Sequence, residues 1–396
     1  MADTTKDIWN DNDGEEEQTP KKHRGLRRFL IFLLTLAAVL GVVVLAAYRD
    51  GTGFVVLRRY FSYGSTQKAY ETVSYTYDAS SSNRFAALGD SLVVLSDTSL
   101  RVLDGDGETL WSTAVRMESP ALVSGGGRAV AYDVGGTALY VLDSSGLAAD
   151  LTDKMEEPII SARLNGSGWL AVTAEKKNYK GAVSVYNQKL ELTFGFHSSQ
   201  RFLMDAWVTD DGKYLAAVAL GQENGTFVSN VVLYDLTRTD PAADYDVRDG
   251  LVLAIGQQGD AIVTVADTCL YLADTAGEEQ GSYRYDSAYL REFSMTGEDY
   301  TVLLLNRYQS GSVGRLVTVG TDGGEIASLD VNEEVLSISA EGRYIAVLYL
   351  DRLVVYNRDL QVYASLNGTS YAREALMRPD GSVLLLGSES AKLFLP

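Results

Sequence analysis

The sequence has very few of the residues that most often carry out catalysis or bind metal ions. It contains one cysteine, Cys269, and two histidines, of which only His197 lies beyond residue 28. A zinc site takes three or four ligands, so a zinc site in this chain would have to consist mainly of carboxylates. No Gly-x-Ser-x-Gly segment is present to offer a nucleophile to His197. We therefore expect no catalytic residues, no metal site and no cofactor.

Positive charge is scarce as well. The chain holds 34 Lys and Arg against 53 Asp and Glu, a formal net charge of −19. A surface with this excess of negative charge repels phosphate groups, so we expect no nucleic acid partner. The single cysteine excludes an intramolecular disulfide. Stability must therefore come from a large apolar core, which a domain of roughly 330 residues can bury.

A repeated pattern runs from residue 89 to the end of the chain. Eight times a small turn leads into an apolar strand, and these turns begin at Gly89, Gly127, Gly166, Asp211, Gly259, Gly297, Glu341 and Asp380. Seven times a second strand and an Asp or Asn turn follow, at Asp104, Asp143, Asn187, Asp235, Asp274, Asp322 and Asn357. The repeat length of roughly 37 to 48 residues is that of four-stranded propeller blades. The sequence therefore predicts an all-β protein with a β-propeller fold.

The last repeat lacks an outer strand. Its strands are predicted near Glu374–Met377, Val383–Gly387 and Lys392–Leu395, and the chain ends at Pro396. An incomplete blade would leave an unpaired edge, which promotes aggregation. The segment Lys68–Tyr77 reads as a strand and belongs to no other blade, so we expect it to complete the eighth blade. The alternative is seven blades with one irregular insertion.

The N-terminal region indicates a membrane anchor. Phe29–Tyr48 is a run of 20 residues without charge, about the length that spans a bilayer as a helix. Five Lys and Arg residues precede it within 21–28, which favours a cytoplasmic N-terminus and an extracytoplasmic propeller. The alternative is a cleaved signal peptide. The predicted order is a disordered cytoplasmic tail (1–28), a transmembrane helix (29–48), a juxtamembrane linker (49–66) and the propeller (67–396).

Enlarged hairpins suggest where the propeller binds a partner. We letter the strands of each blade A to D from the axis outward. The hairpins that join strands B and C are long at Glu175–Gly181, Gly221–Asn230 and Asn306–Gly314. All B–C hairpins emerge on one face of a propeller, and exposed aromatic, Arg and amide side chains are typical of recognition surfaces. Loops also tolerate insertions that have no function. The candidate binding residues are Lys176, Lys177, Tyr179, Lys180, Gln222, Asn224, Phe227, Arg307, Tyr308 and Gln309.

Short segments of the chain resemble known propeller repeats. Leu100–Ser112 is similar to the repeat of pyrroloquinoline-quinone-type propellers, although its tryptophan, Trp111, is not repeated at the same position. Thr209–Ala216 and Arg378–Leu385 are more similar to WD-type and TolB-type repeats. The whole layout resembles a family of uncharacterised, single-pass membrane propellers from Gram-positive, clostridium-like bacteria, classed as a domain of unknown function. That resemblance implies the anchor and the fold, and it supplies no catalytic residues.

Together these observations predict a non-enzymatic binding or scaffolding module at the cell membrane. Its expected partner is an envelope protein or a cell-wall polymer, with the lipid bilayer contacted through Phe29–Tyr48. The first alternative is an enzyme acting on glycan with carboxylates at the axial funnel. The second is a sensor that signals through the single helix.

Overall fold

The computed structural model describes residues 34–36, 73–223, 225–247 and 250–396. The chain divides into two compact units, Met1–Ser65 and Thr66–Pro396. Residues 34–36 of the first unit are helical. In the part of the chain that the structure describes, no helix has the length and apolarity needed to cross a bilayer. The predicted tail and linker, and most of the predicted membrane segment, lie outside the described residues.

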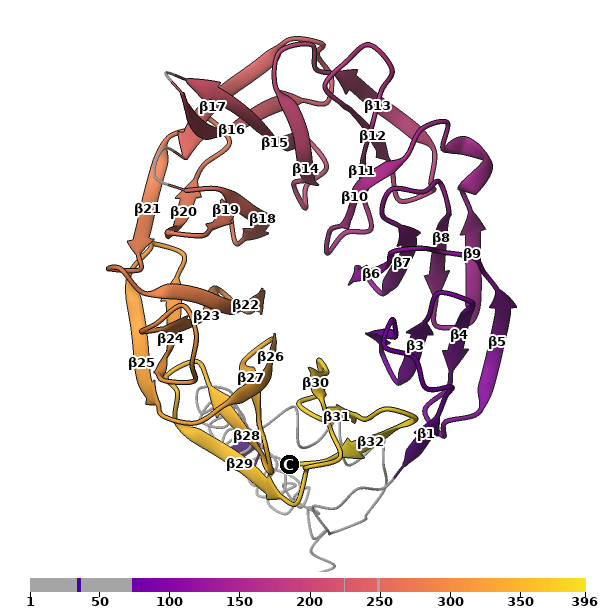
Figure 1. Ribbon diagram of the computed structural model, residues 1–396, viewed down its shortest axis with the longest axis vertical. Coiled ribbons are helices and arrows are strands. Elements are labelled where there is room, and N and C mark those ends of the chain that lie inside the picture. Colours follow the sequence, from indigo (N-terminus) through magenta and orange to yellow (C-terminus); the bar gives the residue numbers. More distant parts are fainter. Residues whose placement is uncertain (1–33, 37–72, 224, 248–249) are drawn as a thin grey trace, which may run out of the picture. The chain divides into compact units, whose positions relative to one another are not determined.

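The second unit is an eight-bladed β-propeller, with four antiparallel strands in each blade (Figure 1). Blades 1 to 4 comprise β2 (Arg84–Leu88), β3 (Ser91–Leu95), β4 (Ser99–Leu103) and β5 (Thr109–Ala114); β6 (Pro120–Gly125), β7 (Arg128–Asp133), β8 (Leu139–Asp143) and β9 (Gly146–Asp150); β10 (Ile159–Leu164), β11 (Leu170–Ala174), β12 (Ala182–Tyr186) and β13 (Leu192–His197); and β14 (Phe202–Val208), β15 (Tyr214–Glu223), β16 (Thr226–Asp235) and β17 (Pro241–Val247). The 3-10 helix η1 (Thr152–Lys154) connects blades 2 and 3.

The remaining blades continue the same order around the axis. Blades 5 to 8 comprise β18 (Val252–Gln258), β19 (Ala261–Ala266), β20 (Cys269–Ala273) and β21 (Glu279–Arg284); β22 (Tyr289–Gly297), β23 (Tyr300–Asn306), β24 (Gly314–Gly320) and β25 (Glu325–Val331); β26 (Val335–Glu341), β27 (Tyr344–Tyr349), β28 (Arg352–Asn357) and β29 (Val362–Asn367); and β30 (Glu374–Met377), β31 (Val383–Leu386), β32 (Ser390–Phe394) and β1 (Ser74–Thr76). The prediction of eight blades is confirmed, and the seven-blade alternative is wrong.

Burial explains the strand composition. The B strands lie between neighbouring blades, so both of their faces are buried, as every residue of β19 and β23 illustrates. The D strands at the periphery alternate between exposed and partly buried residues, as in β5 and β21. Apolar clusters accordingly combine residues of adjacent blades, for example blades 6 and 7 around Tyr300 and Ile345. The core is therefore a series of interfaces between blades.

The ring is closed by a strand from the beginning of the domain. β1 pairs with β32 in the register Ser74↔Lys392, Tyr75↔Ala391 and Thr76↔Ser390. Two backbone hydrogen bonds extend this pairing, from the Tyr77 amide to the Glu389 carbonyl and from the Leu393 amide to the Val73 carbonyl. The Tyr75 side chain is fully buried. The predicted closing segment, Lys68–Tyr77, therefore contains the closing strand, although 68–72 lie outside the described residues.

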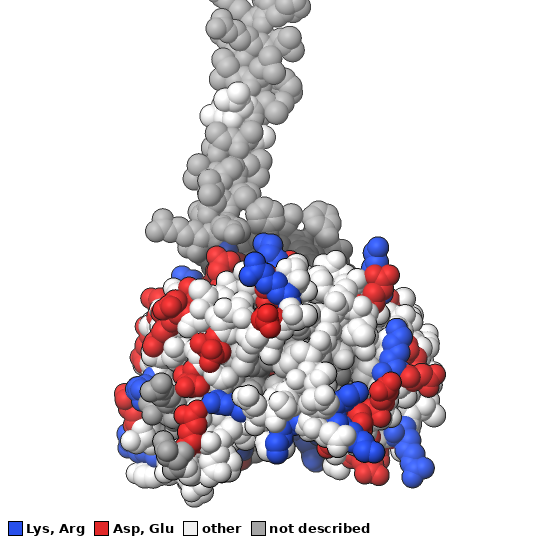
Figure 2. Space-filling view, turned by 90° about the horizontal axis from the view of Figure 1, so that it is seen from above, with Lys and Arg blue, Asp and Glu red and all other residues white. Residues whose placement is uncertain are grey.

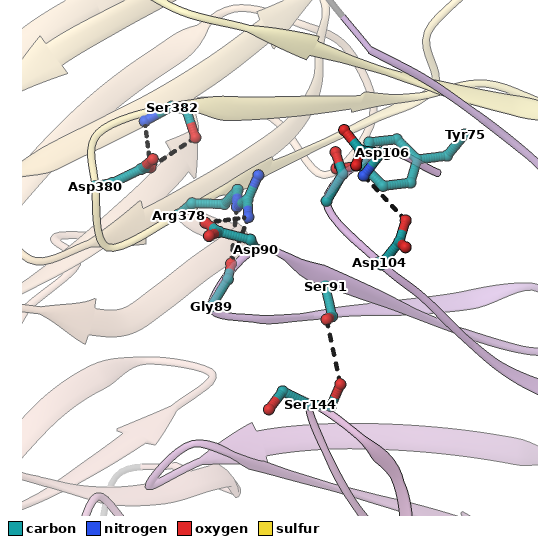
Figure 3. A network of polar contacts seen from close by, with 11 residues as sticks. Tyr75, Gly89, Asp90, Ser91, Asp104, Asp106, Ser144, Arg378, Asp380 and Ser382 are labelled. Carbon is teal, nitrogen blue, oxygen red and sulfur yellow. Dashed lines mark hydrogen bonds and ion pairs between the residues drawn. The ribbon is translucent and has the colours of Figure 1, made fainter. Parts of the chain in front are cut away.

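A buried arginine joins the closing blade to the first one (Figure 3). Arg378, in the A–B turn of blade 8, has only 1% of its side chain exposed and ion-pairs with Asp90 at 3.1 Å. Its Nε donates a hydrogen bond to the Gly89 carbonyl at 3.0 Å, and its Nη2 donates to the same oxygen. Beside it, the Tyr75 hydroxyl donates to the Gly105 carbonyl of blade 1 at 3.3 Å. Both the last turn and the closing strand thus contact blade 1.

Neighbouring A strands are connected by side chains that accept hydrogen bonds from backbone amides. The Ile338 amide donates to Glu292 Oε1 at 3.0 Å, and the Ala340 amide donates to Ser294 Oγ at 3.0 Å. On the opposite side of the ring Arg163 Nη2 forms a 2.7 Å ion pair with Asp205. The A strand is the inner edge of each sheet, so some of its polar groups have no partner in their own blade. These contacts supply a partner from the neighbouring blade.

We predict that Arg378→Met lowers the free energy of unfolding by about 2–4 kcal/mol, because the Gly89 carbonyl loses its charged donors and a buried contact between blades is lost. Denaturant titration measures the change. Arg343→Met is the matched control: its 3.2 Å pair with Glu298 also joins two blades, but the two side chains are 33% and 55% exposed, so it should cost less than about 1 kcal/mol. Equal losses in the two variants would contradict the closing role of Arg378.

Candidate functional site

The B–C hairpins and the connections between blades emerge on the same face of the ring, which we call the B–C face. This follows from the antiparallel order, because strand B runs toward that face, strand C runs away from it and strand D returns to it. Most B–C hairpins are short, such as residues 267–268 between β19 and β20. The hairpins of blades 3, 4 and 6 are the enlarged ones, as predicted.

The blade 3 hairpin, residues 175–181, is folded against the connection to blade 4. Its Tyr179 ring contacts the His197 ring edge-on, with 4.0 Å between centroids. Lys180 Nζ lies 4.3 Å from the centroid of the Phe202 ring, and Lys176 pairs with Glu156 at 3.7 Å. Tyr179 nevertheless remains 41% exposed. The hairpin therefore presents an aromatic ring and ammonium groups from an ordered loop, and His197 supports that ring.

The blade 4 hairpin is strand rather than loop. β15 and β16 pair without interruption from Tyr214↔Asp235 to Glu223↔Thr226, so the expected enlarged loop is an extension of the sheet. Phe227 pairs with Gln222 on this extension and is 69% exposed. Arg201, from the preceding connection, forms a 2.6 Å ion pair with Glu223, whose pairing with Thr226 is the last one before the turn, and so supports the tip of the hairpin. The candidate Asn224 lies outside the described residues.

The blade 6 hairpin, residues 307–313, has a cleft on each side. The Arg307 amide donates to the Val313 carbonyl, and Asn306 Nδ2 donates to the Gly311 carbonyl at 2.8 Å, so the loop is held at both ends. Tyr308 is 59% exposed. The cleft toward blade 7 has a volume of about 350 Å³ and is lined in part by Gln309. The cleft toward blade 5 has a volume of about 410 Å³ and is lined in part by Arg307.

Between these hairpins lie exposed apolar residues that sequence reasoning missed. Phe202 and Met204 of β14, Leu253 of β18 and Tyr289 of β22 are each 40–53% exposed. They lie near the start of the A strands of blades 4, 5 and 6, where these strands leave the B–C face. In the sequence, the only sign of these exposed residues was that apolar side chains occupy the first positions of the A strands. Only the closed ring shows that they share one face with the hairpins.

Three glutamates belong to the innermost strands of blades 6 to 8. Burial raises the pKa of Glu292 to about 7, and the negative charge of Glu374 contributes to this rise, whereas the Ile338 amide and Arg291 oppose it. Burial also raises the pKa of Glu341 to about 7. Reduced solvation raises the pKa of Glu374 as well, and the positive charge of Arg84 opposes this rise. These glutamates are the carboxylates that the sequence-based enzyme alternative would use.

The single cysteine and the repeat residues Asp104 and Trp111 have contacts within the fold. Among the described residues no three His, Cys, Asp or Glu side chains are grouped so that they could hold a metal ion. Asp104 accepts hydrogen bonds from the amides of Asp106 and Glu108, at 3.0 and 2.9 Å, within its own hairpin turn. Trp111 packs on Gly146, where a β-carbon would lie 2.8 Å from the tryptophan Cβ. Cys269 is buried in β20.

The fold is a β-propeller with three enlarged hairpins on one face, and sequence comparison assigns its family. Residues 63–365 match a family of unknown function, DUF5711, and the chain belongs to it. No curated protein matched the sequence.

The fold is similar to the C-terminal WD40 domain of Sif2, with 15% identity, a TM-score of 0.58, and coverage of 84% of this chain and 100% of that chain. It is also similar to the computationally designed Ika8 protein, with 14% identity, a TM-score of 0.60, and coverage of 82% and 99%. Quinohemoprotein alcohol dehydrogenase ADHIIG from Pseudomonas putida HK5 shares 8% identity, a TM-score of 0.52, and coverage of 82% and 76%. Identities this low establish the fold alone. WD-like and quinone-type propellers are thus both structural neighbours, as the repeat resemblance implied.

We predict that Glu292→Gln stabilises the protein at pH 8 by about 1–2 kcal/mol, because the variant carries no partly buried charge and its amide oxygen can still accept from the Ile338 amide. The folded-state pKa of about 7 exceeds the ordinary value of 4.5. The wild type therefore loses stability as the pH rises from about 4.5 to 7, and the advantage of the variant should disappear near pH 4.5.

Thermal or chemical unfolding at pH 4.5 and pH 8 measures this difference. Glu389→Gln is the control, because Glu389 is an exposed residue of a B–C turn. An advantage of Glu292→Gln that does not change with pH would contradict the assigned pKa.

Proposed function

We propose that the protein is a non-enzymatic binding propeller, held outside the cell membrane by Phe29–Tyr48, whose B–C face over blades 3 to 6 captures an envelope protein. The observation that carries this proposal is the concentration of exposed aromatic and apolar side chains on that arc. Tyr179, Phe227 and Tyr308 lie on the enlarged hairpins, and the A-strand residues described above lie between them. Aromatic and Arg anchors supply most of the energy of protein interfaces.

Charge favours a partner with acidic groups. The hairpins of blades 3 and 6 carry Lys176, which pairs with Glu156, together with Lys177, Lys180 and Arg307, although the protein as a whole has a formal net charge of −19. Elsewhere acidic and basic side chains are interspersed, as the side of the ring in Figure 2 illustrates. Complementary charge steers association and selects among partners. An acidic protein is therefore a better fit than a basic one, and a cell-wall polymer with acidic groups is the remaining option.

The first strand of the propeller runs toward the B–C face. Thr76 pairs with Ser390, the first residue of β32 after the B–C turn of blade 8, so Ser74, at the start of β1, lies nearer the opposite face of the ring.

The glycan-acting enzyme is the runner-up, and one observation favours it. A carboxyl group with a pKa of about 7, such as that of Glu292, is suited to general acid catalysis. However, Glu292 Oε1 accepts a hydrogen bond from the next blade, and Glu292 is not among the residues lining the cleft between blades 6 and 7. We therefore assign the glutamate to the interface between blades. A sensor function would add a signalling partner to the same binding face.

We predict that Tyr179→Ala, Phe227→Ala and Arg307→Ala together abolish capture of the partner and leave the fold intact. Each side chain is exposed on a hairpin whose strands stay paired, and each anchor should contribute roughly 1–4 kcal/mol to binding. Crosslinking in intact cells, followed by identification of the captured protein, measures the loss. Thermal melts must first show equal stability. Undiminished capture would place the site elsewhere and favour the enzyme.

Topology is tested separately. Protease added to intact cells from which the wall has been removed should digest the propeller and leave a membrane fragment that contains residues 1–48, because the basic residues before Phe29 retain the N-terminus in the cytoplasm. An N-terminal tag detects the fragment, and permeabilised cells serve as the control, in which the tag is also lost. Protection of the propeller until the cells are permeabilised would reverse the proposed orientation.

A further inference from the structure

The cleft between blades 6 and 7 is a second candidate site, distinct from the aromatic surface. It lies between the blade 6 hairpin and the connection that leads to β26, with a volume of about 350 Å³. Small-molecule clefts occupy roughly 300–1,000 Å³, so this one suits a small ligand. Its apolar wall is formed by Leu304, Val331 and Val335, all of them buried. The hydrogen bond from Asn306 to Gly311 fixes the hairpin side of the cleft.

Opposite charges line this cleft without neutralising each other. Arg291 of β22 and Glu334 of the connection to blade 7 both border it and both are exposed. Neither forms an ion pair or hydrogen bond with another described residue, so the two charged groups are more than 4.0 Å apart. Glu333, by contrast, ion-pairs with Arg352 of β28 at 2.5 Å. The cleft thus offers one cationic and one anionic group, separated by a gap.

The remaining polar groups suit an amide backbone. Gln309, Ser310 and Ser312 of the hairpin line the same cleft. Amide and hydroxyl side chains both donate and accept hydrogen bonds, as a peptide group between two charged termini requires. No aromatic residue lines the cleft, so a sugar ring would find no stacking partner, and the two glutamates disfavour a phosphate.

We propose that the cleft between blades 6 and 7 binds a short zwitterionic peptide, with the carboxylate of the peptide on Arg291 and its α-ammonium group on Glu334. The guanidinium can hold a carboxylate through two parallel hydrogen bonds, which a lysine could not do. The hairpin side chains bond the peptide group, and a small apolar side chain contacts the wall of Leu304, Val331 and Val335. This site shares only Gln309 with the candidate binding residues of the B–C face, and Tyr179, Phe227 and Tyr308 do not line it.

Calorimetric titration of the full-length chain with three related probes tests the proposal. Alanylalanine carries both charges, N-acetyl-alanylalanine lacks the ammonium group, and alanylalanine amide lacks the carboxylate. We expect each blocked peptide to bind about three- to tenfold more weakly than alanylalanine, the effect of one partly solvated ion pair.

The variants make the assignment specific. In Glu334→Gln the preference for alanylalanine over its N-acetyl form should disappear, while the preference over the amide remains. In Arg291→Gln the preference for alanylalanine over its amide should disappear, while the preference over the N-acetyl form remains. Glu118→Gln and Arg116→Gln are matched controls, since they change exposed residues of the connection between blades 1 and 2 on the same face, and they should retain both preferences.

Three results would overturn the proposal. They are an absence of heat with alanylalanine at millimolar concentration, preferences that neither cleft variant changes, and tighter binding of the uncharged disaccharide diacetylchitobiose. Loss of partner capture by the hairpin variants would not bear on it, so failure of one proposal can be distinguished from failure of the other.

Discussion

The pairing of β1 with β32 is the interaction on which the rest of this structure depends. It covers only three residue pairs, but without it the eighth blade would end in an unpaired edge and contact blade 1 only through its A strand and its A–B turn. Fully buried Tyr75 and the buried Arg378 join the two ends of the domain at this position. Because the apolar clusters lie between blades, the fold cannot lose one interface without weakening its two neighbours.

The closed ring converts scattered sequence insertions into one surface. Contacts between equivalent strands, such as Arg163 with Asp205 and Glu292 with the Ile338 amide, hold successive blades in place. Recognition residues on a rigid scaffold lose little conformational freedom on binding. Blade 5 contributes no long hairpin, so the hairpins of blades 4 and 6 flank exposed Leu253. A broad surface of this kind is better suited to a protein than to a small substrate, whereas the polar cleft beside it suits a small ligand.

Local patterns were sufficient to predict most of the fold. Turn residues at a fixed interval and alternating apolar residues gave eight blades, and the missing outer strand identified a segment that contains β1. The hairpins of blades 3 and 6 were placed within about one residue. The blade 4 segment was expected as a loop, but Gln222 and Phe227 extend the ladder. Contacts such as that of Arg378 with Gly89 join residues 289 positions apart, and no local pattern encodes them. Likewise, only the closed ring brings exposed Phe202 and Met204 onto the same face as the hairpins.

Amide hydrogen exchange resolved to single residues tests the closure of the ring most directly. The Tyr77 and Leu393 amides, which bond across the closing pair, should exchange only by global unfolding, with the same free energy as amides in the centre of β27 (Tyr344–Tyr349). The Tyr308 amide in the blade 6 hairpin should exchange by local motion. Exchange of Tyr77 and Leu393 at a free energy several kcal/mol below that of β27 would show that the ring opens locally, and would contradict the role given to β1.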